Sequence, residues 1–302
     1  MSAIASFSVS LPANYRPQDA LRRIGRDPET RDEQTGESQF TKALLLGAAG
    51  ERFPVRLRIS LTSQMAQASV ESTRPVSEAV VSEALTVTHR LLGLTLDPDP
   101  FEERAQAEES VRRLVAGREG LRIALTASVF EGVIWAILGQ QVNVTFASTL
   151  RRRLIDLCGH DAGDGFLAHP APEDVARLDY ADLTPLQISQ RKAEYVIDTA
   201  RLATEGLLPL EDLAALPYPE AENRLLAVRG FGPWSANYLL MRSCGFPDCV
   251  PLGDTGIRDP VRRFFGLDHA PTVSEVAEHM AIFAPHRSLA TFHLWHFPVS
   301  PV

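Results

Sequence analysis

The sequence predicts an α+β protein in which an N-terminal domain, with an antiparallel β-sheet and helices, is followed by an all-helical domain. Segments in which apolar and polar residues alternate occur within the first hundred residues. Beyond them, apolar residues recur at helical spacing, and short polar or glycine-rich segments separate the periodic ones. We therefore predict domains at residues 1–100 and 101–302.

Alternation with period two predicts the strands of the first domain. The alternating segments, of which the last two are weak, are 5–11, 53–59, 42–46 and 67–70. Turn-forming residues between these segments indicate antiparallel pairing. A stripe of apolar residues from Val80 to Leu91 then predicts a helix over 76–92, and the proline-containing segment 94–100 is expected to be a linker.

Capping residues divide the second domain into helices. Ser128 and Glu131 have the spacing of a capping box, in which the serine caps the Glu131 amide and Glu131 caps back. Asn143 has the position of an N-cap for the next helix. The segment Thr184-Pro-Leu-Gln187, with proline in the first turn, predicts the start of a further helix.

The composition is that of a folded, acidic protein. The chain has 302 residues, of which 45% are hydrophobic and 23% charged, and its net charge is −8. This balance argues against a protein that coats nucleic acid without specificity, although it leaves room for a local basic face. Lys42 and Lys192 are the only lysines among 30 basic residues. Positive charge therefore resides almost wholly on arginine, which suits fork-like contacts with phosphate or carboxylate.

Three cysteines limit the redox and metal chemistry of the chain. Cys158, Cys244 and Cys249 provide neither a disulfide framework nor the four thiolates of an iron–sulfur or zinc site. The N-terminal segment lacks the features of a secretory signal. The most apolar segment, 123–138, contains Glu131 and is too short to span a bilayer. We expect a cytoplasmic protein without membrane contact.

A glycine-rich turn between two predicted helices carries the strongest chemical signal. A helix over about 219–227 leads into Gly230-Phe231-Gly232, and Pro233 stands where the next helix begins. The glycines allow a tight turn with positive φ, and Phe231 would fill the angle between the helices. The amides at the start of the second helix would then form a site for one phosphate. An ordinary αα-hairpin accounts for this motif alone equally well.

Charge around this turn favours the phosphate site. Residues 224–263 contain six arginines and three aspartates, a local charge of +3 in an acidic chain. Asp254 lies just before a helix with apolar periodicity, where the commonest role of aspartate is that of an N-cap. A carboxylate there, kept ionised at neutral pH with help from the helix dipole, could also stabilise positive charge on a sugar or accept a proton from attacking water. The two roles are compatible.

Three segments resemble the helix-hairpin-helix (HhH-GPD) DNA glycosylases. They are LLAVRGFGPWSANYLLMRSCGFPDCVPLGDTGIR, which contains the turn and second helix of the hairpin at about 219–242, FEGVIWAILGQQVNV from Phe130, and the segment from Gln187 to Tyr195. Together they span about residues 128–295. The β-rich N-terminal third indicates the 3-methyladenine DNA glycosylase II branch. The resemblance implies a two-lobed all-helical glycosylase domain that holds DNA in its cleft.

The resemblance also assigns roles to residues. Asp254 falls on the catalytic aspartate, and Trp234, Tyr238 and Trp295 fall on aromatic positions that line the pocket for the flipped base. Trp234 also stands where glycosylases with lyase activity carry their Schiff-base lysine, so a monofunctional enzyme is implied. Gln141 falls on the residue that fills the gap left by the flipped base. The implied DNA-binding residues are Gln140, Gln141, Arg229, Gly230, Phe231, Gly232 and Ser235.

Further implications concern ions and partners. The family's hairpin binds a monovalent cation through backbone carbonyls, here those of Leu226, Val228 and Phe231, so Na⁺ or K⁺ is implied as a structural ion. No cofactor is implied for catalysis, and an iron–sulfur cluster is excluded because no cysteine follows Cys249. The implied partner is double-stranded DNA with a damaged base, bound by a monomer. The implied setting is the nucleoid of a bacterial cytoplasm.

The implied activity is the hydrolytic excision of alkylated purines of the 3-methyladenine type in base excision repair. Rotating a nucleotide out of the duplex has an energetic cost, which phosphate contacts and Gln141 would offset. A purine alkylated at N3 or N7 is cationic, leaves readily and stacks favourably on tryptophan or tyrosine. Two alternatives stay open: a glycosylase for oxidised or deaminated purines, and a non-catalytic helix-hairpin-helix module that binds DNA.

Several of these residues also have plain structural interpretations. Without the resemblance, Trp295 in an aromatic C-terminal segment is more often part of a core. Tyr238 follows Trp234 by one helical turn and fits a core stripe as well as a pocket wall. The segment Arg151-Arg152-Arg153 is expected to be a solvated face rather than a DNA contact.

Overall fold

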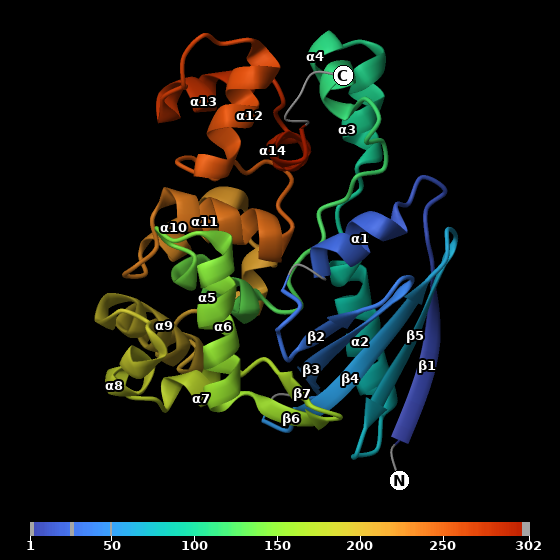
Figure 1. Cartoon of the computed structure of the whole chain (residues 1–302), viewed down its shortest axis with the longest axis vertical. Coiled ribbons are helices and arrows are strands. Elements are labelled where there is room, and N and C mark those ends of the chain that lie inside the picture. The colour runs from blue at the N-terminus through green and yellow to red at the C-terminus, as the bar shows by residue number, and fades with distance from the viewer. Residues whose placement is uncertain (1–2, 25–26, 49, 298–302) are drawn as a thin grey trace. The chain divides into compact units, whose positions relative to one another are not determined.

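A computed structural model describes residues 3–24, 27–48 and 50–297 (Figure 1). The chain forms two compact units. The first consists of Met1–Leu92 and Thr126–Glu211, and the second of Gly93–Leu125 and Asp212–Val302. Each unit combines two separate segments of the chain, whereas the predicted domains are continuous segments that meet at residue 100. The predicted division at residue 100 therefore stays a prediction.

The first unit contains an antiparallel sheet, as the sequence predicts, and this sheet has five strands where four are predicted. Its strands are β1 (Ala3–Ser10), β2 (Glu33–Thr35), β3 (Gln39–Leu46), β4 (Phe53–Leu61) and β5 (Met65–Ser72). They lie in the order β1-β5-β4-β3-β2 (Figure 1). The weakly predicted segments 42–46 and 67–70 belong to β3 and β5, where β4 pairs Leu57 with Lys42 on one side and with Val70 on the other. β2 is too short to show alternation and is missed by the sequence analysis.

Helix α2 (Glu78–Leu91) packs against this sheet through contacts with β1, β3 and β5 (Figure 1). Its buried residues include Val80, Ala84, Val87 and Leu91, which belong to the stripe that predicts the helix. Ser77 caps it by accepting a hydrogen bond from the first turn. The N-terminal core therefore forms between one amphipathic helix and the sheet.

The rest of the first unit is helical apart from one hairpin. Its elements are α1 (Pro17–Ile24), α5 (Val129–Leu138), α6 (Val144–Cys158), β6 (His160–Gly163), β7 (Phe166–Ala168), α7 (Pro172–Ala176), α8 (Tyr180–Leu183), η2 (Thr184–Leu186) and α9 (Gln190–Thr204). The hairpin β6–β7 is an addition to the predicted helices. It packs on β3 and β4, and an ion pair between Arg56 and Asp164 joins it to the sheet.

Two of the three predicted helix starts are confirmed. Ser128 and Asn143 are the N-caps of α5 and α6, and the side chain of each accepts a hydrogen bond from an amide of the first turn. The third prediction is wrong. The segment 184–186 forms a separate 3₁₀ turn that ends at Gln187 with φ of 63°, and α9 begins later, with Ser189 as its N-cap.

The second unit is helical. Its elements are α3 (Asp99–Glu103), η1 (Arg104–Gln106), α4 (Glu109–Val115), α10 (Tyr218–Leu226), α11 (Pro233–Leu239), η4 (Leu240–Cys244), α12 (Thr255–Phe265), α13 (Val273–Ala281) and α14 (Arg287–Trp295), while η3 (Leu210–Ala215) crosses the division between the units. Asp99 lies in the predicted linker but opens α3, which corrects that prediction. The rings of Phe101 and Phe264 flank Phe283 at centroid distances of 6.2 and 6.1 Å in the core. In the described part of the chain, none of the helices has the length and apolar character needed to cross a bilayer.

Candidate active site

The hairpin of α10 and α11 forms as the glycine-rich turn predicts, with one difference. Gly230 has φ of 101°, a left-handed conformation that favours glycine. Gly232 has φ of −117° and ψ of −179°, which is extended backbone, so only one of the two glycines is needed for positive φ. Phe231 between them is buried, as expected for a residue that fills the angle between the helices.

The start of α11 leaves backbone amides without a side-chain cap. Gly232 is the N-cap and provides no side chain, and Pro233 follows it in the first turn. Arg229 is exposed beside this turn, whereas Ser235 is only 3% exposed. The turn therefore offers the guanidinium of Arg229 and the backbone around Gly232 to an anion, and it offers little of Ser235.

A polar network joins the two helices of the hairpin. The Asn237 amide donates a hydrogen bond to the Glu222 carboxylate at 2.7 Å and another to the Pro233 carbonyl at 3.1 Å. The Tyr218 hydroxyl lies 2.8 Å from Glu222 and 2.9 Å from Asn237. Burial and the bond with Glu222 raise the pKa of the Tyr218 hydroxyl, which keeps it a donor. The sequence analysis misses this network, because its members form no recognisable motif.

The three aromatic residues assigned to the base pocket lie together. The rings of Trp234 and Tyr238 are stacked, with centroids 5.4 Å apart and planes at 27°. Trp295 of α14 continues the group, with its ring 6.2 Å from that of Tyr238. All three side chains are half-buried. Because residues of a core stripe would be fully buried, the three rings do not form one, and their role in a base pocket stays a prediction.

Asp254 is both the N-cap of α12 and a neighbour of this aromatic group. Its carboxylate accepts a hydrogen bond from the Gly256 amide at 2.8 Å and another from the Trp295 indole. Burial raises the pKa of Asp254 above its ordinary value of 3.8, and the two hydrogen bonds offset part of that rise. The help expected from the helix N-terminus is therefore outweighed by burial. The role of Asp254 as an N-cap is therefore confirmed, and its chemical role stays a prediction.

The loop before Asp254 is fastened to the helix that carries Trp295. Asp248 and Arg287 form a two-pronged ion pair with N–O distances of 2.6 and 2.7 Å. Beside it, the Ser288 hydroxyl accepts a hydrogen bond from the loop backbone at 2.9 Å. These contacts hold the loop against α14 and so help to fix Asp254 relative to the aromatic group. The sequence analysis misses them, because the partners are 39 residues apart.

Comparison with known proteins agrees with this geometry. The model of the HhH-GPD superfamily of base excision DNA repair proteins matches residues 134–285. The chain is also 32% identical over 290 residues to a DNA-3-methyladenine glycosylase of Bacillus subtilis, a match that covers 95% of both proteins. The chain belongs to the HhH-GPD superfamily.

Solved structures support the fold of this HhH-GPD chain. A 3-methyladenine DNA glycosylase from Archaeoglobus fulgidus superposes with a TM-score of 0.83 at 20% identity, over 96% of this chain and 97% of that one. A 3-methyladenine DNA glycosylase from Schizosaccharomyces pombe, in complex with abasic DNA, gives a TM-score of 0.57 at 26% identity, over 65% of this chain and 95% of that one. The predicted fold class is confirmed.

The two glutamines assigned to DNA lie in the first unit of this HhH-GPD chain, on the turn between α5 and α6. Gln140 is half-buried, and Gln141 is exposed. Gln141 has φ of 55°, a left-handed conformation that is uncommon for residues other than glycine. An exposed side chain on a fixed turn has the accessibility that entry into a duplex requires.

The carbonyl groups expected to hold a monovalent cation lie at the end of α10 and in the turn after it. Leu226 is the last residue of α10, where carbonyl groups lack an intrahelical partner. The Val228 carbonyl accepts a hydrogen bond from the Phe231 amide at 3.1 Å and keeps a second lone pair. Neutral carbonyl oxygens can replace the hydration shell of such an ion, so these three oxygens are suitable ligands for the implied Na⁺ or K⁺.

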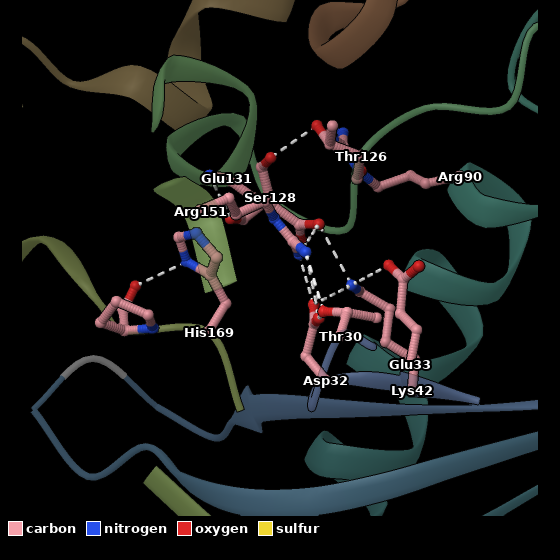
Figure 2. A network of polar contacts seen from close by, with 11 residues as sticks. Thr30, Asp32, Glu33, Lys42, Arg90, Thr126, Ser128, Glu131, Arg151 and His169 are labelled. Carbon is pink, nitrogen blue, oxygen red and sulfur yellow. Dashed lines mark hydrogen bonds and ion pairs between the residues drawn. The ribbon is translucent and has the colours of Figure 1, made fainter. Parts of the chain in front are cut away.

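A buried ionic network lies where β3 meets α5 and α6 in the first unit (Figure 2). Lys42 is 1% exposed, and its ammonium contacts Asp32 at 2.9 Å and Glu131 at 3.1 Å. Glu33 lies 2.6 Å from the same ammonium. Arg151 also pairs with Asp32 and, at 3.0 Å, with Glu131. The three carboxylates are close enough to hold a metal ion, but Lys42 and Arg151 already pair with them.

This network corrects two predictions. Glu131 does not complete the capping box with Ser128, because its carboxylate pairs with Lys42 and Arg151 instead. Arg151 does not belong to a solvated face, since it is 8% exposed and fully paired (Figure 2). Burial alone would raise the pKa of Asp32, but Arg151 and Lys42 outweigh it and hold that pKa far below 3.8.

Proposed function

We propose that this chain is a monofunctional DNA glycosylase that hydrolytically releases alkylated purines of the 3-methyladenine type from double-stranded DNA in base excision repair. The observation that carries the proposal is the half-buried Asp254 carboxylate, bonded to the Trp295 indole. Beside Trp295 lies the ring of Tyr238, which stacks on that of Trp234, and both of these rings are also half-buried. The names of the relatives in Bacillus subtilis and Schizosaccharomyces pombe support the same substrate class.

A cationic purine suits this group of residues. Alkylation at N3 or N7 places a positive charge on the base, and a cation over an aromatic face gains roughly 0.5–2 kcal/mol. When the bond between C1′ and the base nitrogen breaks, its electron pair leaves with the base and positive charge develops on the sugar. Asp254 stabilises that charge. Water then forms the new bond to C1′ and loses a proton, which leaves a free base and an abasic site.

Lyase chemistry needs an amine, and neither lysine of the chain is free to supply it. By the resemblance in sequence, Trp234 falls on the position of the lyase lysine, and an indole cannot form an imine. Lys42 is buried among three carboxylates. The ammonium of Lys192, the second of the two lysines, donates to the Leu138 carbonyl at 2.6 Å. The DNA strand is therefore expected to stay intact after excision.

Two turns are proposed to contact DNA, with the chain acting as a monomer. The hairpin offers Arg229 and the backbone of Gly230-Phe231-Gly232 to a phosphate. A monovalent cation held by the carbonyls of Leu226, Val228 and Phe231 would add positive charge at this turn. Gln141, with Gln140 beside it, would fill the gap left by the flipped nucleotide.

Product analysis on duplexes that each carry one lesion tests the proposal. We expect free alkylated purine, such as 3-methyladenine or 7-methylguanine, and an abasic strand that breaks only after alkali. Borohydride is expected to trap no protein–DNA adduct, and a trapped adduct would contradict the monofunctional mechanism. Release of oxidised or deaminated purines instead would favour the other class of glycosylase. Tight binding of abasic DNA without release of any base would identify a non-catalytic module.

A further inference from the structure

The Lys192 ammonium lies at the C-terminal end of α5. Its Nζ donates a hydrogen bond to the Leu138 carbonyl at 2.6 Å, between the packed helices α5 and α9. Leu138 is the last residue of α5 and is fully buried. Carbonyl groups in the last turn of a helix have no intrahelical partner, and a buried acceptor without one is destabilising. Lys192 therefore supplies the hydrogen bond that completes the end of α5.

The position of Lys192 is unfavourable for its own helix. Ser189 is the N-cap of α9 and accepts a hydrogen bond from the Lys192 amide, so Lys192 lies in the first turn. That turn carries partial positive charge, which disfavours a cation. The C-terminal end of α5 carries the opposite partial charge and attracts one. The Lys192 ammonium is therefore electrostatically favourable at the end of α5 and unfavourable at the start of α9.

The bond from Lys192 comes directly before the turn that carries Gln140 and Gln141. The Gln140 amide makes a long backbone hydrogen bond of 3.3 Å, and Gln141 then adopts its left-handed φ of 55°. On the far side of the turn, Asn143 begins α6 as its N-cap, with a 2.8 Å hydrogen bond. The exposed Gln141 therefore stands in a short turn that side chains fix at both ends, Lys192 at Leu138 and Asn143 at α6.

We propose that Lys192 is a positioning residue for this turn. By completing the C-terminal end of α5, it keeps Gln141 in the conformation that presents its side chain to DNA. The inference rests on the proposed function, in which Gln141 fills the gap in the duplex. Without the ammonium, the Leu138 carbonyl loses its partner and the turn gains conformational freedom, so that Gln141 enters the duplex less completely.

A double-mutant cycle between Lys192 and Gln141 tests this role. Lys192→Met keeps the aliphatic stem and removes the ammonium, and we expect a single-turnover excision rate about 10-fold lower. The fluorescence of 2-aminopurine placed beside the lesion, which reports base flipping, should fall in parallel. Because both variants disable the same step, the double variant should be no slower than Gln141→Ala alone. Lys192→Arg keeps a cationic donor and is expected to restore most of the rate.

Arg191→Met is the matched control. Arg191 is an exposed cation one residue earlier, and its guanidinium bonds to the Tyr195 hydroxyl of the same helix. If Lys192 served only to attract phosphate, Arg191→Met would reproduce the loss, and the effects of Lys192→Met and Gln141→Ala would multiply. Either result would overturn the positioning role.

Further outcomes separate this inference from the function on which it rests. Wild-type excision by Lys192→Met overturns the positioning role and leaves the proposed function intact. Wild-type excision by Gln141→Ala overturns both the DNA role of Gln141 and this inference. A wild-type protein that releases no base contradicts the proposed function itself. Thermal unfolding of every variant shows that it is folded, and Lys192→Gln replaces Lys192→Met in the cycle if the latter does not fold.

Discussion

At Asp254, one side chain serves as a helix cap and as a partly buried charge. The cap fixes its direction, and the Trp295 indole fixes its second contact. Gly256 leaves room for this arrangement, since a Cβ there would lie 3.3 Å from the Asp254 carboxylate and 3.6 Å from the Trp295 nitrogen. Burial raises the pKa of Asp254, and this effect does not strengthen its capping hydrogen bond with the Gly256 amide. A carboxylate held in this way, beside aromatic rings, is typical of a functional site.

The variant Trp295→Phe separates the donor from the aromatic ring. The indole hydrogen bond lowers the pKa of Asp254, so its loss is expected to raise that pKa further. Since excision needs the ionised carboxylate, the acid limb of the pH–rate profile should move to higher pH, while the rate at neutral pH falls less than about 10-fold. Single-turnover rates measured from acidic to neutral pH check this. An acid limb at its wild-type position would show that Trp295 does not act on Asp254.

At the scale of elements, the buried network joins β3 to α5 and α6 through charge rather than apolar packing (Figure 2). Its two cations pair with three carboxylates inside the first unit. Removing one member of such a group leaves a buried charge without compensation, which destabilises a protein far more than the loss of a surface pair. The network is therefore expected to matter for stability, and its central member is Lys42.

We expect Lys42→Met to lower the free energy of unfolding by about 3–5 kcal/mol, because Asp32 and Glu131 lose one of their two shared cations and Arg151 alone cannot compensate both. Urea denaturation at neutral pH measures the loss. Arg224→Met is the control: Arg224 pairs with Glu220 one helical turn away, both side chains are exposed, and its loss should lower that free energy by less than about 1 kcal/mol. Equal effects of the two variants would contradict the importance of the network.

The same network predicts a pH dependence of stability. The pKa of Asp32 is held below its ordinary value of 3.8, so its contribution is fully present above that pH in the folded protein. As the pH falls below 3.8, the unfolded chain takes up the proton first and the contribution is progressively lost. In Lys42→Met this acid-dependent part should be smaller, which urea denaturation at several acidic pH values can measure.

Features set by local sequence are predicted well, and features set by distant contacts are not. The stripe of α2 and the caps Ser128 and Asn143 follow from spacing along the chain, and the structure has them. Lys42 meets Glu131 across 89 residues, and Asp248 meets Arg287 across 39, so neither pair leaves a periodic trace. The hairpin β6–β7 is not predicted for the same reason, because its short strands depend on packing against the sheet rather than on local sequence.

The candidate site also combines features that local sequence predicts with contacts that it does not. The turn at Gly230 and the placement of Asp254 before a helix are local patterns, and a motif resemblance adds the aromatic residues of the site. The polar contacts that hold these groups, such as the bond between Asn237 and Glu222, involve common residue types at unremarkable spacing. These contacts can be recognised only in the folded structure, where the two helices lie against each other.

At the scale of the whole molecule, an acidic chain contains one segment with an excess of positive charge, which includes the turn of the hairpin. The net charge is −8, but residues 224–263 carry +3. Such a protein can contact DNA through a limited face without coating it. The fold is shared with glycosylases of low sequence identity, so the chemistry resides in the side chains that the fold presents rather than in the fold itself.

Replacing the charge of Asp254 tests the central claim most directly. Asp254→Asn keeps an oxygen that can accept the hydrogen bond from the Gly256 amide, so α12 and its cap should be preserved. Because the amide is neutral, burying it avoids the cost of burying a charge, and the unfolding temperature should not fall. The measurement is single-turnover excision of 3-methyladenine from a duplex. The account predicts a rate at least about 100-fold below wild type, with affinity for abasic DNA preserved. Excision by the variant at the wild-type rate would contradict it.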